Sequence, residues 1–154
     1  MSRRTPYVIY GGVALLTFLV YLGALGNGFV NWDDQMYVYE NADIRSIDIR
    51  FLKLIFTTVM ASNWHPLTML SYAVDYSIWG QDPLGYHLVN NLLHSANTLL
   101  VGVLGARLTE QAGSGARASL FTGATLALLF GLHPLHVESV AWVSERKDVL
   151  SALF

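Results

Sequence analysis

Residues 7–25, YVIYGGVALLTFLVYLGAL, decide the fold class of this chain, and residues 26–41, GNGFVNWDDQMYVYEN, follow them directly. The first stretch has no charged residue over about 19 positions, close to the roughly 20 that an α-helix needs to cross the apolar core of a bilayer. The second stretch places two neighbouring carboxylates, Asp33 and Asp34, just beyond that run. The sequence therefore predicts a spanning helix with an acidic pair close to one of its ends.

The composition of the whole chain also indicates a membrane protein. Of the 154 residues, 53% are hydrophobic and 13% are charged, which differs from the averages for soluble domains, and the mean hydropathy is +0.41. The net charge of −2 gives no indication of a nucleic-acid partner. The absence of cysteine excludes a disulfide, a thiolate nucleophile and a cysteine-bound metal. We expect an all-α membrane protein. Because residues 149–154 are apolar and carry no stop signal, we expect residues 1–154 to be the N-terminal part of a longer transmembrane domain.

Charges on either side of the first span predict its orientation. Arg3 and Arg4 precede it, so the positive-inside rule keeps the N-terminus in the cytoplasm and sends residues 26–84 across the membrane. This outer loop has seven acids and three bases, as an outside segment should. A cleaved signal peptide is the alternative, because a basic start and small residues near 24–26 fit it loosely, but the apolar core is too long for one.

Two short helices are predicted within the outer loop. Residues 47–60 combine apolar and charged side chains in an amphipathic pattern suited to lying along the membrane interface. A second short helix should follow Pro66 and run through Thr68 to Trp79, with Gly80 ending it.

Two further spans are predicted at about 85–106 and 118–132, and a fourth begins at about 148. On 85–106, four polar side chains share one helical face: His87, Asn91, His94 and Thr98. Inside a bilayer such a face turns toward other helices, either as hydrogen-bonding contacts between helices or as the lining of a substrate cavity. Both interpretations remain open. The turn at 107–117 has a basic excess, which agrees with a cytoplasmic location.

The position of the ionisable residues separates classes of function. The cores of the three spans contain no Asp, Glu, Lys or Arg, and such residues gather at the outer boundary. A proton-coupled transporter or a channel usually needs ionisable groups near the bilayer midplane. The sequence therefore favours an enzyme acting on a lipid-linked substrate at headgroup depth. A transporter and a non-catalytic membrane anchor for a later repeat domain are the alternatives.

Four motifs carry a resemblance to a known family. They are residues 26–41, NWHPLTMLSYAVDY at 63–76, GYHLVNNLLHSANTLL at 85–100 and FGLHPLHVESVAWVSERKDVLSALF at 130–154. In this order they resemble the N-terminal membrane region of the transmembrane and tetratricopeptide-repeat (TMTC) proteins and their bacterial relatives, which are GT-C glycosyltransferases. The resemblance covers nearly the whole chain.

This resemblance implies a multi-pass GT-C-type helical bundle, in the inner membrane for a bacterial relative, with the first long loop in the periplasm. It also implies transfer of a sugar from a polyprenyl-phosphate carrier to a Ser or Thr hydroxyl of a protein acceptor, with Asp33 as the catalytic member of the acidic pair. Arg146 and Asp148 match the family pattern better than Lys147 does, and His65 stands where many relatives have arginine. The identity of the sugar is not implied.

The chemistry of such a transfer gives each candidate residue a role. A hydroxyl that attacks an anomeric carbon needs a carboxylate to accept its proton. We assign that role to Asp33, with Asp34 shaping the site or holding a divalent cation, the one cofactor left open. A departing phosphate is stabilised by cations and imidazoles. The candidates for binding the lipid phosphate or the sugar are Arg146, Lys147, His136, Glu138, His87, His94 and His65.

Each candidate also has a structural alternative. Asn31 or Asp33 would cap a loop helix equally well, since Asp and Asn are strong N-caps. Residues 144–148 would also suit the solvated start of a helix. The spacing of His133, His136 and Glu138 across a proline is not a standard zinc pattern, so headgroup or supporting contacts are expected for His136 and Glu138.

Overall fold

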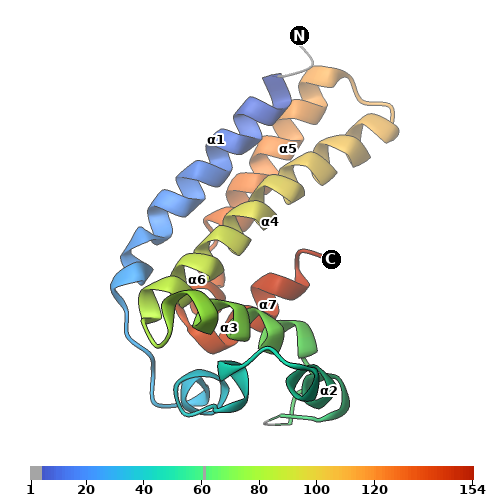
Figure 1. Cartoon of the computed structure of the whole chain (residues 1–154). Helices are drawn as coiled ribbons and strands as arrows, with labels where there is room; N and C mark the ends of the chain where they lie inside the picture. Colours follow the sequence, from blue (N-terminus) through green and yellow to red (C-terminus); the bar gives the residue numbers. More distant parts are fainter. Residues whose placement is uncertain (1–4, 61) are drawn as a thin grey trace.

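The computed structural model describes residues 5–60 and 62–154, and these form helices joined by short turns (Figure 1). The long helices are α1 (Thr5–Val20), continued by the 3-10 turn η1 (Tyr21–Gly26), α4 (Pro83–Gln111) and α5 (Ala116–Gly131). The shorter elements are η2 (Gln35–Tyr39), η3 (Asp43–Arg45), α2 (Ile49–Thr57), α3 (Pro66–Trp79), α6 (His136–Ala141), η4 (Val143–Glu145) and α7 (Arg146–Ser151). The described residues contain no strand, so the all-α prediction is confirmed.

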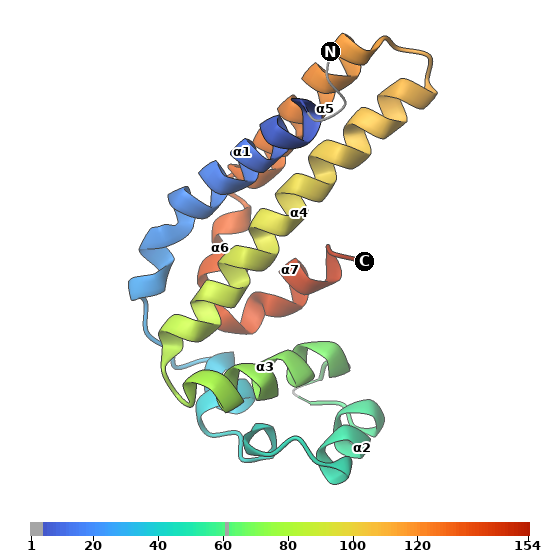
Figure 2. The same cartoon turned by 45° about the horizontal axis from the view of Figure 1, so that its top comes forward.

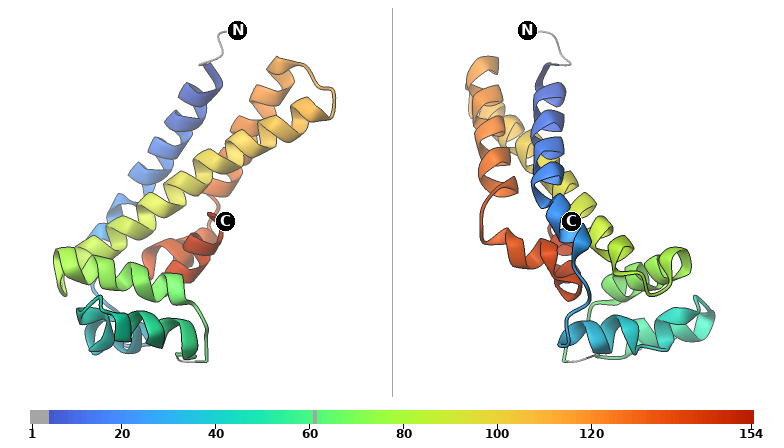
Figure 3. Two further views of the ribbon diagram at one scale, coloured as in Figure 1. Left: turned by 45° about the vertical axis from the view of Figure 1, so that its right-hand side comes forward. Right: turned by 90° about the vertical axis from the view of Figure 1, so that its left-hand side faces the viewer.

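The helices form two parts. Helices α1, α4 and α5 run beside one another as an elongated bundle, while α2 and α3 lie across one end of it (Figures 1 and 2). Helices α6 and α7 lie along the half of α4 that is closer to α3 (Figure 2). The start of α1 and the turn between α4 and α5 lie together at the opposite end (Figure 3).

Small residues let α4 and α5 approach closely. Buried small residues spaced four positions apart lie along each helix: Thr98, Gly102 and Ala106 on α4, and Ser119, Gly123, Ala127 and Gly131 on α5. A Cβ atom added at Gly123 would lie 2.5 Å from the carbonyl oxygen of Gly102 and 2.7 Å from the hydroxyl of Tyr10 on α1. The three helices therefore meet at backbone distance, as helices with small-residue stripes do in membranes.

The outward faces of these helices are apolar. Exposed large side chains include Leu15 and Leu19 on α1, Leu100 and Leu104 on α4, and Phe121 and Leu129 on α5. By length and composition, one helical segment of the described chain, Thr5–Gly26, is long and apolar enough to cross a membrane, and α5 is apolar but shorter. The residues whose charge set the predicted orientation, Arg3 and Arg4, lie outside the described residues.

Residues 26–84, the predicted outer loop, share a buried core with α4 and η4. Buried side chains from η2, η3, α2, α3 and α4 and from η4 meet there: Tyr37, Val38, Ile44, Phe51, Ile55, Met69, Tyr72, Ala73, Tyr86 and Val143. Asp48 caps the start of α2: its carboxylate accepts a hydrogen bond from the Phe51 N–H at 2.9 Å. Helix α3 begins at Pro66 and ends at Trp79 before Gly80, which has φ of +60°. Both predicted short helices are thus confirmed.

Candidate functional site

Asp34 is a buried anchor. It is 1% exposed, and one carboxylate oxygen accepts hydrogen bonds from both the backbone N–H (2.9 Å) and the hydroxyl of Ser144. The other oxygen accepts the N–H of Val30 at 3.0 Å. Hydrogen bonds to a charged acceptor are stronger than those between neutral groups, so a carboxylate with several donors holds them firmly. Asp34 therefore fixes the loop after the first helix to a segment 110 positions later.

Asp33 differs from its neighbour. Its side chain is half-buried, and its carboxylate has no hydrogen-bond or ion-pair partner within the described part of the chain. A helical turn begins at Asp33, but neither its side chain nor that of Asn31 accepts a backbone N–H among residues 5–60 and 62–154, so the capping interpretation is not supported. Among the described residues, nothing binds the Asp33 carboxylate, whereas hydrogen bonds occupy both oxygens of Asp34.

Arg146 is fully buried, at 0% exposure. Its guanidinium donates to the Asn90 side chain at 2.7 Å, to the Tyr86 carbonyl at 2.8 Å and to the Ser71 hydroxyl at 3.2 Å, and it pairs with the carboxylate of Asp75. Burial raises the pKa of the Asp75 carboxyl, and the Arg146 charge opposes that rise. The packing leaves no face of the Arg146 guanidinium open to a ligand, and its contact with a lipid phosphate stays a prediction.

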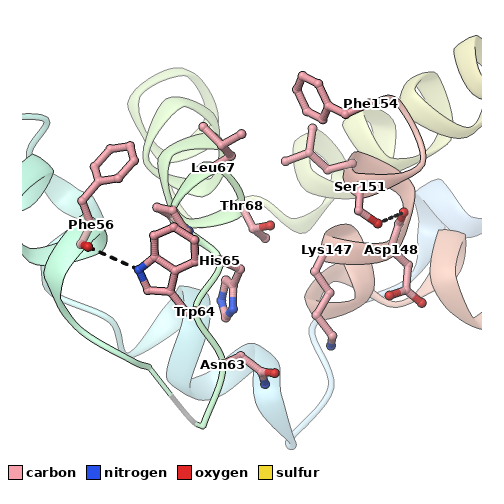
Figure 4. A pocket seen from close by; sticks show the side chains of 12 residues that line it. Phe56, Asn63, Trp64, His65, Leu67, Thr68, Lys147, Asp148, Ser151 and Phe154 are labelled. Atoms are coloured by element: carbon pink, nitrogen blue, oxygen red, sulfur yellow. Dashed lines mark hydrogen bonds between the residues drawn. The ribbon is translucent and has the colours of Figure 1, made fainter.

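Lys147 and His65 both line a cavity of about 630 Å³ (Figure 4). One wall comes from Phe56 and residues 63–68, and the other from residues 147–154 (Figure 4). The lining is mostly apolar: Phe56, Trp64, Leu67, Leu150 and Phe154 contribute to it. The cavity therefore combines an apolar lining with a cation, an imidazole and the carboxylate of Asp148.

The charge state of this cavity follows from its surroundings. Burial alone would lower the pKa of the Lys147 ammonium, but the hydrogen bond and charge of Glu145, whose carboxylate lies 2.6 Å away, outweigh it and the pKa is raised. Burial and then the Lys147 charge lower the pKa of His65. The His65 ring contacts Tyr37 edge-on, with 5.0 Å between ring centroids. Lys147 is thus a cation at neutral pH, and His65 is a neutral imidazole.

The remaining predicted site residues lie elsewhere. His94 and His136 line a second cavity of about 270 Å³, with 5.2 Å between their ring centroids. His87 is buried at 1% exposure, close to the Gly28 backbone and the Asp34 charge. Glu138 is exposed and lines neither cavity. The predicted set is therefore divided among several places.

The polar stripe on α4 makes contacts between helices. The Asn91 side chain donates to the Phe18 carbonyl on α1 at 3.0 Å, and the His94 ring lies 3.0 Å from the Gly131 carbonyl on α5. Thr98 donates to the His94 carbonyl within α4. Asn91 and His94 thus act as hydrogen-bonding contacts between helices, and His94 also lines the second cavity.

The described residues offer no cluster of three or more side chains of the kinds that hold a metal ion. Both oxygens of Asp34 already accept hydrogen bonds. No site for the divalent cation left open by the sequence is assigned among residues 5–60 and 62–154.

Two residues of the buried network were not singled out by the sequence. Ser144 binds Asp34, and Asp75 pairs with Arg146. A signal for Asp75 exists: it is the one charged residue in the apolar sequence of α3. Such an acid in a buried helix needs a cationic partner.

Comparison with known proteins finds similar sequences along most of the chain. A protein O-mannosyl-transferase of Drosophila melanogaster, Tmtc2, is 37% identical over 147 residues, which is 90% of this chain and 15% of the relative. TMTC4 of Mus musculus is 34% identical over 158 residues (92% and 21%), and TMTC4 of Homo sapiens is 41% identical over 98 residues (60% and 13%). No family model and no solved structure matches the chain.

The chain thus spans a fifth or less of the length of most of these relatives, and 21% of the mouse protein. The similarity nevertheless covers about nine-tenths of the chain itself. The chain is therefore TMTC-like: over about nine-tenths of its length it is similar to relatives named TMTC protein O-mannosyl-transferases.

Proposed function

We propose that this chain is part of a multi-pass membrane glycosyltransferase that moves a sugar from a polyprenyl-phosphate carrier to a Ser or Thr hydroxyl of a protein. The names of its relatives support transfer of a sugar to protein. The observation that carries the proposal is the contrast within the acidic pair: Asp34 is held by three donors, while no described residue binds the Asp33 carboxylate.

The packing of α1, α4 and α5 supports three spans in this proposal. Their mutual faces carry small residues and the polar stripe, and their outward faces carry large apolar side chains. This is the distribution expected when lipid surrounds a helical bundle. The start of α1 and the α4–α5 turn lie at one end, as a shared cytoplasmic side requires, and α2 and α3 at the other (Figure 3). In a bacterium the second end would be periplasmic.

Asp33 supplies the base in the proposed reaction. Its carboxylate accepts the proton of the acceptor hydroxyl as that oxygen bonds to the anomeric carbon. The bond between the anomeric carbon and the phosphate oxygen breaks, and the electron pair leaves with the lipid phosphate. A single displacement of this kind inverts the anomeric centre.

The cavity between α3 and α7 is the proposed place of the carrier. Lys147 would stabilise the charge of the departing phosphate, and His65 would contribute a hydrogen bond. The apolar lining from Phe56, Trp64 and Leu67 suits the first isoprene units of the carrier. We assign no catalytic metal to the described residues and route no step through one.

The test uses the full-length protein in membranes with polyprenyl-phosphate mannose and other polyprenyl-phosphate sugars. Asp33→Asn should lower the transfer rate about 10²- to 10⁴-fold, the range for a general base, with membrane insertion intact. The matched control is Asp43→Asn, because Asp43 is an exposed acid of the same loop. Hydroxyl-linked glycopeptides measured by mass spectrometry report the transfer. Equal activity of Asp33→Asn and wild type would refute the assignment and favour a membrane anchor.

A further inference from the structure

The buried pair of Arg146 and Asp75 lies behind the cavity that holds Lys147. Arg146 is the first residue of α7, and Lys147, Leu150 and Ser151 of that helix line one wall of the cavity. Asp75 belongs to α3, whose first turn, Pro66–Thr68, lines the opposite wall. The pair therefore joins the two helices that form the cavity.

The guanidinium of Arg146 is occupied on every side. It donates four hydrogen bonds to acceptors on α3 and α4, which are the Asp75, Ser71 and Asn90 side chains and the Tyr86 carbonyl. The rings of Tyr72 and Tyr86 lie 4.8 and 5.8 Å from its central carbon. Arg146 is 0% exposed, and the Asp75 side chain is 4% exposed. A phosphate could reach this guanidinium only after the packing around it had been broken.

The neighbouring backbone is held as firmly. The hydroxyl of Tyr72 donates to the Val143 carbonyl at 2.9 Å, and the Asn90 side chain donates to the Trp142 carbonyl at 3.1 Å. Together with Asp34 and Ser144, these contacts fix residues 142–146 immediately before Lys147.

We propose that Arg146 and Asp75 are positioning residues that set the separation of the two cavity walls and the place of Lys147, and that Arg146 itself makes no contact with the carrier phosphate. The proposal rests on the proposed function for the identity of the ligand. Its geometric content, that the pair fixes Lys147, stands apart from that function. Removal of one partner leaves a buried charge without compensation, whereas removal of both restores a neutral packed interior.

The experiment compares Arg146→Met, Asp75→Leu and the double variant in the full-length protein. Farnesyl phosphate is the binding probe, and the second readout is the acylation rate of Lys147 by an amine reagent, measured relative to the exposed Lys53 by mass spectrometry. Each single variant should weaken farnesyl phosphate binding about tenfold or more and raise the relative acylation of Lys147. The double variant should return both quantities to within about threefold of wild type.

Two outcomes would overturn the proposal. If the double variant binds as weakly as Arg146→Met while Asp75→Leu binds normally, the guanidinium contacts the phosphate directly. If neither single variant changes the acylation of Lys147, the pair does not position it.

The acylation readout separates this proposal from the proposed function. A wild-type protein that neither binds farnesyl phosphate nor transfers sugar would refute the function, while Lys147 acylation would still decide the role of the pair. Arg146→Lys is the second variant if Arg146→Met does not fold, because lysine keeps the charge but cannot bridge several acceptors as a planar guanidinium does. It should raise Lys147 acylation above wild type; an unchanged rate would contradict the proposal.

Discussion

Replacement of Asp34 by alanine should release the loop after the first helix from the segment at Ser144. In the wild type, the buried carboxylate accepts two hydrogen bonds from Ser144 and one from Val30. Alanine would leave the Ser144 N–H in a buried site without an acceptor. This is a structural effect, and it should appear even in the absence of any substrate.

The size of the effect follows from the number of donors. A hydrogen bond to a charged group contributes about 1.5–3 kcal/mol, so the two donors of Ser144 give about 3–6 kcal/mol of local stability. Since 1.4 kcal/mol corresponds to a factor of ten in an equilibrium constant, the local opening constant should rise about 10²- to 10⁴-fold.

Amide hydrogen exchange at Ser144 measures this opening directly. Full-length Asp34→Ala should exchange at Ser144 faster by the factor given above, while Asp33→Ala, its matched control, should exchange like wild type because no described residue binds the Asp33 carboxylate. Unchanged exchange at Ser144 in Asp34→Ala would refute the anchoring role. Equal acceleration in both variants would show that the two carboxylates are not distinguished as described.

Two further predictions concern packing and pH. Gly123→Leu should lower the free energy of unfolding by about 1–3 kcal/mol or more, because its Cβ would lie 2.5 Å from the Gly102 carbonyl oxygen. Gly12→Leu should be tolerated, since a Cβ there meets no atom within 4 Å, and equal thermal unfolding midpoints for the two variants would contradict this prediction. The lowered pKa of His65 means that the unfolded chain binds the proton more readily, so the stability from neutral His65 is complete above the ordinary histidine pKa and is lost as pH falls through the folded value. His65→Gln should therefore lose less thermal stability than wild type between pH 7 and pH 5, and parallel pH profiles would contradict the shift.

Local signals in the sequence allowed the helices α2 and α3 to be predicted. Pro66 and Gly80 mark the two ends of α3 because proline fits the first turn of a helix and glycine accepts a positive φ. The polar stripe on α4 was likewise readable from helical periodicity. Its partners were not, because two of them are backbone carbonyls on other helices, at Phe18 and Gly131.

The candidate site shows where reading the sequence reaches its limit. Arg146 stands among the charged residues 145–148, a pattern typical of a solvated surface, yet it is buried because α3 and α4 supply four acceptors for it. Those acceptors lie 56 to 75 positions earlier in the chain. No spacing rule connects residues so far apart, so the partnership of Arg146 with Asp75 could be found only in three dimensions.

The bond between Asp34 and Ser144 also has a consequence during protein synthesis. Asp34 emerges from the ribosome 110 residues before Ser144, an interval of roughly 5 to 20 seconds at about 5–20 residues per second. Throughout that time the loop carrying Asp33 lacks its anchor, and α3 lacks the guanidinium that compensates Asp75. The acidic pair is thus translated early but assembled late, and a nascent chain that stops short of Arg146 would expose an unneutralised carboxylate on α3 to cellular quality control.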